Sequence, residues 1–391
     1  MSLIPSLVRL KNVLDEAVRQ YWICNACRLC NDLCPVFTVM SSKPIIEHRD
    51  TVLLANLCYD HRDCYYSCPY VPPHEFSVNI PEINRRVRLE TYSNLNFNII
   101  KTMWGKVILA ALTIPIILMW IIYGKNIFVG GPISFYRLIP KDVIVIAGTI
   151  SVLYIIAWAI AILARYDRML GPGYRPSLST LPRTLKNIFL HHWFEKIHYP
   201  GDEWGNTRYV YHILIFYGLG LDIIATILGF YYEDFLHIMS PFSLANPVVI
   251  IGIVGGVMII IGTVIAFYAR YVSAISQRFM PISAIDFAFA IVLFLVALTG
   301  VLVLLFRVFY PSEPYLTYTI LLIHLTLVYY FFILAPFTTT MPHILVRAWS
   351  LWIYETIVSR NWKIEPGRML VNLPKHKHTK NPNKHVPTYR R

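Results

Sequence analysis

Seven cysteines, all between residues 24 and 68, constrain this chain more than any other feature of its sequence. The first four follow the pattern C-x2-C-x2-C-x3-C-P, in which three thiolates hold one iron–sulfur cubane and the fourth reaches a second. A second set nearly repeats this spacing, but a histidine stands at one cysteine position. The eight predicted ligand positions are Cys24, Cys27, Cys30, Cys34, Cys58, His61, Cys64 and Cys68.

We expect the two sets to be wired crosswise, as the spacing implies. The first cluster would then take Cys24, Cys27, Cys30 and Cys68, and the second would take Cys34, Cys58, His61 and Cys64. Both are predicted to be [4Fe-4S] clusters. The second would be a three-iron [3Fe-4S] cluster if the imidazole stays out of the ligand sphere.

Zinc and disulfide frameworks are the alternatives to iron–sulfur. Paired C-x2-C units also hold tetrahedral zinc, but zinc sites rarely carry three cysteines in series that end in Cys-Pro. A disulfide scaffold is disfavoured because the long remainder of the chain contains no cysteine. The pattern therefore favours reduced thiolates that face the cytoplasm.

The rest of the composition indicates a membrane protein. Of the 391 residues 56% are hydrophobic, and the mean hydropathy is +0.52, which is too apolar for a soluble chain. The formal charge of +13 comes from Lys and Arg clustered beside apolar stretches, so it indicates lipid contact and topology, and no nucleic-acid partner is expected. Asp15 and Glu16 interrupt the N-terminal segment, so no cleavable signal peptide is expected.

Apolar stretches of spanning length occur six times. Seven Lys and Arg lie between residues 164 and 209 and ten lie after residue 345, against none between residues 231 and 247. By the positive-inside rule, both termini and the cysteine region are predicted to be cytoplasmic, in a multi-pass plasma-membrane protein. The predicted spans are 105–123, 143–164, 209–231, 247–268, 284–306 and 315–338.

The predicted fold class is all-α, with an α-helical dicluster ferredoxin domain and a six-helix transmembrane bundle. Residues 6–22 have apolar residues at helical spacing, and the segment between the cysteine sets shows little strand alternation. The expected domains are a cytoplasmic cluster domain (1–98), a transmembrane cytochrome b module (99–345) and a basic cytoplasmic tail (346–391).

Four ionisable residues stand out within or beside the spans, where such groups are costly and are functional candidates. They are His212, Asp222, His324 and His343. Imidazoles on facing helices are common axial ligands of haem, and interhelical hydrogen bonds are the alternative. Depth pairs His212 with His343 near the cytoplasmic side, because Asp222 lies about 15 Å further along its helix.

By the same argument His324 lies level with Asp222. These two residues could hold a second haem, form a proton relay, or form a hydrogen-bonded pair. A carboxylate is not among the usual axial ligands of haem, which disfavours the second haem. The expected haem count is therefore one or two.

Several stretches resemble the tricarballylate-utilisation electron-transfer protein B (CitB-like) family. They are LDEAVRQYWICNACRLC, ANLCYDHRDCYYSCPYVPPHEFSVNIP, RYVYHILIFYGLGLDIIAT, KIHYP, DFAFAIVLFLVALTG and IHLTLVYYFFILAPF. The resemblance covers most of the chain and is most specific around the cysteines. The chain departs from the family at His61, which is usually cysteine, and at Asp222, where a non-acidic residue is expected.

The resemblance implies an electron-transfer subunit that performs no substrate chemistry of its own. Electrons would come from the reduced FAD of a partner dehydrogenase, cross two clusters and haem b, and reach membrane quinone. Alternatives are a subunit of a heterodisulfide-reductase-type or other respiratory complex, and a transporter with an iron–sulfur sensor domain. The transporter would require broken helices and internal repeats, which the sequence does not show.

Replacing the histidine within the second cysteine set tests its predicted role. A neutral imidazole in place of a thiolate makes a cluster easier to reduce, so His61→Cys should lower the midpoint potential of the second cluster. An EPR-monitored redox titration measures this potential, with the first cluster as the internal control. Unchanged potentials for both clusters, or a native three-iron cluster, would show that the imidazole is not a ligand.

Overall fold

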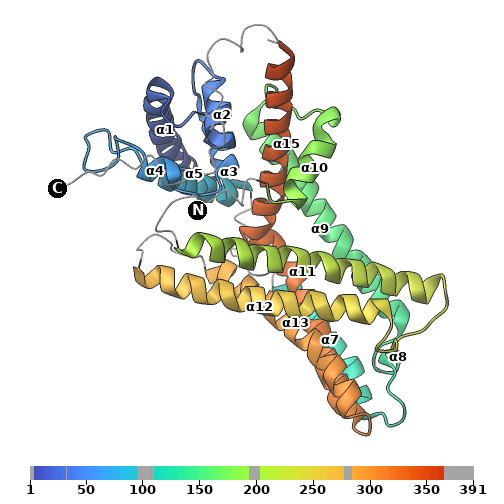
Figure 1. Ribbon diagram of the computed structural model, residues 1–391. Coiled ribbons are helices and arrows are strands. Elements are labelled where there is room, and N and C mark those ends of the chain that lie inside the picture. The colour runs from blue at the N-terminus through green and yellow to red at the C-terminus, as the bar shows by residue number, and fades with distance from the viewer. Residues whose placement is uncertain are drawn as a thin grey trace.

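A computed structural model describes residues 4–31, 33–95, 107, 110–192, 203–276 and 284–364 of this chain. Its regular elements are all helices, and no strand occurs within these ranges. The all-α prediction is therefore confirmed. Figure 1 shows two regions, the helices of the first 95 residues, which carry the cysteines, and a set of later helices that extends away from them.

Five helices build the cysteine region. Its first helix carries the predicted apolar face, since Val13, Leu14, Ala17 and Tyr21 are buried, and it continues beyond the predicted end into the first ligands. The five are α1 (Ile4–Cys27), α2 (Pro35–Ser41), α3 (His48–Leu57), α4 (Asp63–Tyr66) and α5 (Ile80–Leu95). The buried hydroxyl of Tyr21 donates to Asn84 Oδ1 (2.7 Å), which ties α1 to α5.

Apolar helices follow, all of them long except α7, which has 10 residues. They are α7 (Ile114–Tyr123), α9 (Lys141–Leu170), α11 (Glu203–Asp234), α12 (Pro247–Ser276), α13 (Ala284–Phe309) and α14 (Pro314–Leu334). Five segments are long and apolar enough to cross a membrane: Lys141–Leu170, Thr207–Asp234, Pro247–Ala269, Phe287–Phe309 and Pro314–Phe337. They match predicted spans two to six. The first predicted span, 105–123, lies partly outside the described residues, and its described part is the apolar α7.

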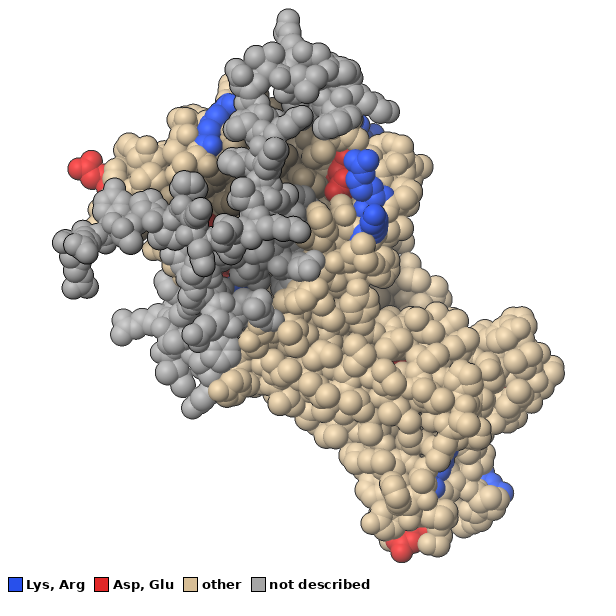
Figure 2. Space-filling model, in the orientation of Figure 1, with Lys and Arg blue, Asp and Glu red and all other residues tan. Residues whose placement is uncertain are grey.

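The surface of these helices fits a lipid environment. Large apolar side chains such as Ile150 and Ile160 of α9 are more than half exposed, at 62% each. Among the residues coloured in Figure 2, charged side chains gather toward the two ends of the molecule and leave a broad uncharged band between them. The chain therefore associates with a membrane.

The core of the cysteine region extends across the expected domain boundaries. Residues beyond 345 were expected to form a basic tail, yet α15 (Thr340–Ile364) packs into the core through Val346 and Leu351. The inner end of α9 joins the same core, where the Tyr166 hydroxyl lies 2.7 Å from Ser350 Oγ. Burial of an apolar helix face explains why this stretch of the expected tail is ordered. Residues 365–391 lie outside the described part.

Glycines let α11 and α12 approach closely, and Figure 1 shows the two helices side by side along most of their length. A Cβ at Gly218 would lie 2.9 Å from the carbonyl oxygen of Gly255 and from Ile259 Cγ1. A Cβ at Gly262 would lie 3.1 Å from the carbonyl oxygen of Tyr211. Small residues at such crossings are typical of helix pairs in membranes.

The close approach of α11 and α12 predicts a strong effect of adding one methyl group. Gly218→Ala should lower the melting temperature in detergent, because overpacking costs about 1–3 kcal/mol. Gly220→Ala is the matched control on the same helix, since a Cβ there meets nothing within 4 Å. Equal melting temperatures for the two variants would contradict the observed crossing.

Candidate metal centres

The structure brings together the four cysteines of the predicted first cluster. Cys24 and Cys27 lie on the last turn of α1, Cys30 follows in a turn, and Cys68 follows α4. These four side chains line one hollow together with Leu29, Phe37, Pro69 and Tyr70. All seven cysteines are free of disulfides, so each thiol is available as a ligand.

The other three cysteines form a second group. Cys34 directly precedes α2, Cys58 ends α3 and Cys64 lies on α4. Burial and, next, a Cys58 thiolate raise the pKa of Cys34 to about 12. Burial likewise raises the pKa of Cys64 well above its ordinary value, with Cys58 and Cys34 as the next causes. Cys34, Cys58 and Cys64 thus lie near one another, and the crosswise ligation of two clusters stays a prediction.

The loops around the sulfurs present backbone N–H groups to them. The Asp60 N–H donates to Cys58 Sγ and the Tyr70 N–H donates to Cys68 Sγ, both at 3.4 Å. Arg28, Asp60 and Arg62 adopt the left-handed region, with φ of 56°, 58° and 66°, which is strained for residues other than glycine. Such loops turn donors toward sulfur, as iron–sulfur sites require.

The spacing of the donors bears on the zinc alternative. Within the described ranges, no three side chains of His, Cys, Asp or Glu are close enough to hold a single metal ion. A zinc ion would need its thiolates about 2.3 Å from one centre. An iron–sulfur cluster, whose several iron atoms keep the ligands further apart, stays the prediction from the cysteine spacing.

His61 lies on the loop between Cys58 and Cys64. Its ring stacks on Tyr59, with centroids 5.7 Å apart and planes at 22°. The Tyr59 ring in turn lies 3.9 Å from the guanidinium carbon of Arg347. The loop is therefore held from the α15 side, and ligation by His61 stays a prediction.

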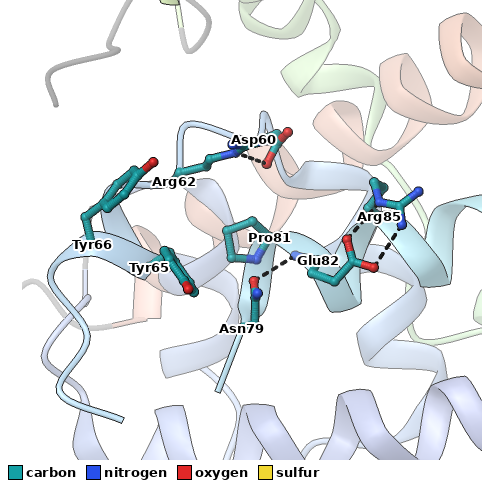
Figure 3. A pocket seen from close by; sticks show the side chains of 8 residues that line it. All are labelled: Asp60, Arg62, Tyr65, Tyr66, Asn79, Pro81, Glu82 and Arg85. Atoms are coloured by element: carbon teal, nitrogen blue, oxygen red, sulfur yellow. Dashed lines mark hydrogen bonds and ion pairs between the residues drawn. The ribbon is translucent and has the colours of Figure 1, made fainter. Parts of the chain in front are cut away.

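A polar pocket lies beside this loop (Figure 3). Arg62 pairs with Asp60 at 3.5 Å, and Arg85 forms a bidentate pair with Glu82 at 2.8 Å for both hydrogen bonds. The remaining lining residues are Tyr65, Tyr66, Asn79 and Pro81. The arginines and carboxylates of the pocket pair with one another, so we do not propose a charged ligand for it.

Three histidines gather where the long helices meet the cysteine region. His212 of α11 lies beside His191, with ring centroids 5.1 Å apart. Burial lowers the pKa of His343, on α15, well below its ordinary value, and Arg347 and then His212 lower it further. His212 thus acts electrostatically on His343, and the pairing of the two as haem ligands stays a prediction.

His191 was not among the site residues predicted from sequence. It follows α10 (Leu181–Phe189), is 7% exposed, and has a φ of 50°. Burial lowers its pKa. A histidine in a connecting segment carries no signal of burial, so only tertiary packing places it at this site.

Asp222 and His324 occupy different contacts. The carboxylate of Asp222 lies over Gly255 of α12, where it would meet an added Cβ. His324 Nδ1 lies 3.0 Å from the Thr299 hydroxyl, and its ring faces Gly300 of α13. In the part of the chain described here, no hydrogen bond or ion pair joins Asp222 to His324. The hydrogen-bonded pair considered from the sequence is therefore not formed. A second haem or a proton relay stays a proposal.

One helix connects the histidine site to the second cysteine group. His343 and Arg347 are four residues apart on α15 and therefore share a face. Arg347 Nη2 donates to the carbonyl oxygen of Cys58 at 2.9 Å. The two candidate centres are thus linked through adjacent turns of a single rigid element.

Comparison with known proteins finds similarity over most of the chain. The profile described as citrate utilization protein B Fer4-like domain matches residues 17–94, and the profile described as citrate utilization protein B matches residues 101–352. Citrate utilization protein B of Escherichia coli is 28% identical over 301 residues, which cover 73% of this chain and 79% of that protein. No solved structure matches the chain.

The exposure and pKa of the cysteines predict unequal alkylation of the metal-free protein. Burial raises the pKa of Cys24 to about 12, whereas Cys27 is exposed. At pH 8 iodoacetamide should therefore modify Cys27 more than about tenfold faster than Cys24, because only the thiolate reacts. Raising the pH toward 12 should accelerate Cys24.

Peptide mass spectrometry over time measures both alkylation rates, and urea-unfolded protein is the control in which the rates converge. Equal rates in the folded protein would contradict the described first cysteine group.

Proposed function

The chain belongs to the citrate utilization protein B family, and on that basis we propose that it is a membrane electron-transfer subunit. It would pass electrons from a reduced flavoprotein dehydrogenase, similar to tricarballylate dehydrogenase, through two iron–sulfur clusters and haem b to quinone. The observation that carries this proposal is the proximity of the second cysteine group to His343 through α15. A soluble redox domain is thereby joined to a candidate membrane cofactor site.

The cysteine groups support the cluster part of the proposal. Cys24, Cys27, Cys30 and Cys68 would hold one cluster, and Cys34, Cys58 and Cys64, with His61, would hold the other. Iron–sulfur clusters and haem both supply one-electron transfer when bound. The chain's own part is to orient the thiols, to donate N–H groups to sulfur, and to exclude water through the apolar core beneath them.

His212 and His343 are the proposed axial ligands of haem b. They come from two different helices, and burial holds His343 in the neutral form that binds iron. His191 packs edge-on against both His212 and Phe216, with centroids 5.1 Å and 4.8 Å apart. It would help to fix the orientation of the His212 ring.

The partners follow from the same arrangement. Cys27 and the apolar Leu29 and Leu33 are exposed on the cysteine region, where a flavoprotein could approach the first cluster. The long apolar helices provide access to a quinone dissolved in the bilayer. We place the termini and the cluster domain in the cytoplasm, at the plasma membrane, from the distribution of Lys and Arg.

Haem content tests the proposal. The purified protein should contain iron, acid-labile sulfide and a b-type haem spectrum, and His212→Ala or His343→Ala should abolish that spectrum because an axial ligand is lost. Asp222→Asn is the control within the same helix as His212, and it should retain haem.

The pyridine haemochrome assay measures haem, and the two clusters are followed separately by EPR. Full haem content in both histidine variants would overturn the ligand assignment. Loss of haem only in His324→Ala would place the haem deeper in the membrane.

A further inference from the structure

Two arginines from different helices meet at one backbone carbonyl beside the second cysteine group. Arg88 of α5 donates from Nη1 to the carbonyl oxygens of Ala55 (2.8 Å) and Cys58 (3.0 Å). Arg347 of α15 donates to the same Cys58 oxygen at 2.9 Å and lies over the Tyr59 ring. Both guanidinium groups thus lie against the residue that bears one of the three thiols.

Neighbouring arginines are neutralised by carboxylates, whereas these two are not. Arg62 and Arg208 both pair with Asp60, at 3.5 Å and 3.7 Å, and Arg85 pairs with Glu82 at 2.8 Å. Within the described residues, neither of the two arginines at the Cys58 carbonyl forms an ion pair with a carboxylate. Both are only partly exposed, and charged groups removed from water are ordinarily compensated by an opposite charge.

A cluster at the second cysteine group would supply that opposite charge. Cys58 is buried and accepts from both arginines through its own carbonyl oxygen, and a cysteine binds iron as the thiolate. The two arginines therefore lie where a cluster held by Cys34, Cys58 and Cys64 would place negative charge.

We propose that Arg88 and Arg347 are positioning residues that set the reduction potential of the cluster held by Cys34, Cys58 and Cys64. One-electron reduction adds negative charge to the cluster, and two nearby positive charges that lack carboxylate partners stabilise the reduced form. Net charge and hydrogen bonding are two of the factors that determine cluster potentials. The inference rests on the proposed function, because it presupposes that the second cysteine group binds a cluster.

The placement of Arg347 indicates in which direction a raised potential of the second cluster would drive electrons. It is on the same face of α15 as His343, between the second cysteine group and the proposed haem ligand. A raised potential at the second cluster favours electron movement from the exposed first cluster toward the membrane helices. The two arginines would thus draw the electron to the position from which the membrane cofactor receives it.

The test compares midpoint potentials in the purified, cluster-loaded full-length protein. Arg88→Gln and Arg347→Gln each remove one charge. Each should shift the reduced-to-oxidised ratio of the second cluster about tenfold toward the oxidised form, or ~59 mV more negative. Arg86→Gln is the matched control, because Arg86 is on α5 but exposed, and it should leave the potential close to that of the wild type.

Lysine variants separate charge from hydrogen-bond geometry. Arg88→Lys and Arg347→Lys keep the positive charge and should keep the wild-type potential. A lysine variant with a potential as low as its glutamine counterpart would overturn the proposal that charge is responsible. So would unchanged potentials in both glutamine variants.

Iron and sulfide content distinguishes the possible failures. If the wild type binds no cluster at Cys34, Cys58 and Cys64, the proposed function fails and the inference fails with it. If both glutamine variants lose this cluster while both lysine variants keep it, the arginines are structural, and only the inference is overturned. Because the two residues are on different helices, misfolding of one variant leaves the other to decide.

Discussion

The carbonyl oxygen of Cys58 accepts hydrogen bonds from two arginines that come from opposite ends of the chain, and the arrangement of both centres depends on this contact. Arg88 belongs to the cysteine region, and Arg347 belongs to the helix that follows the last membrane span. A carbonyl that is shared by two charged donors fixes α5, α15 and the end of α3 relative to one another. The second cysteine group and the His343 site therefore have a defined separation.

The apolar core beneath this contact explains why it is rigid. Side chains from α1, α3 and α5 pack with Val346 and Leu351 of α15 and with Tyr166 of α9. Burial of these groups removes apolar surface from water and holds α9 and α15 to the cysteine region. A redox domain and a membrane module built around one core can keep a short electron path between them.

The membrane part uses a different kind of packing. Lipid supplies no hydrophobic drive between helices, so α11 and α12 approach through Gly218 and Gly255, where Asp222 fills the space over a missing side chain. His324 satisfies its buried nitrogen with the hydroxyl of Thr299 on the neighbouring helix. Both polar residues thus make packing contacts at helix crossings. Any role of Asp222 or His324 in proton or electron transfer would have to be compatible with these contacts.

The sequence by itself determined the helical class, five spans that the structure bears out, and the division of the seven cysteines into two sets. These follow from local signals, namely hydropathy over a window of residues and fixed ligand spacing. Helical rise also predicts that His212 lies level with His343, and their pairing as haem ligands stays a prediction. Only the tertiary structure placed α15 in the core, put His191 against His212, and brought Arg88 and Arg347 to Cys58. Those contacts join residues far apart in the chain, and no local pattern encodes which distant surfaces bury each other.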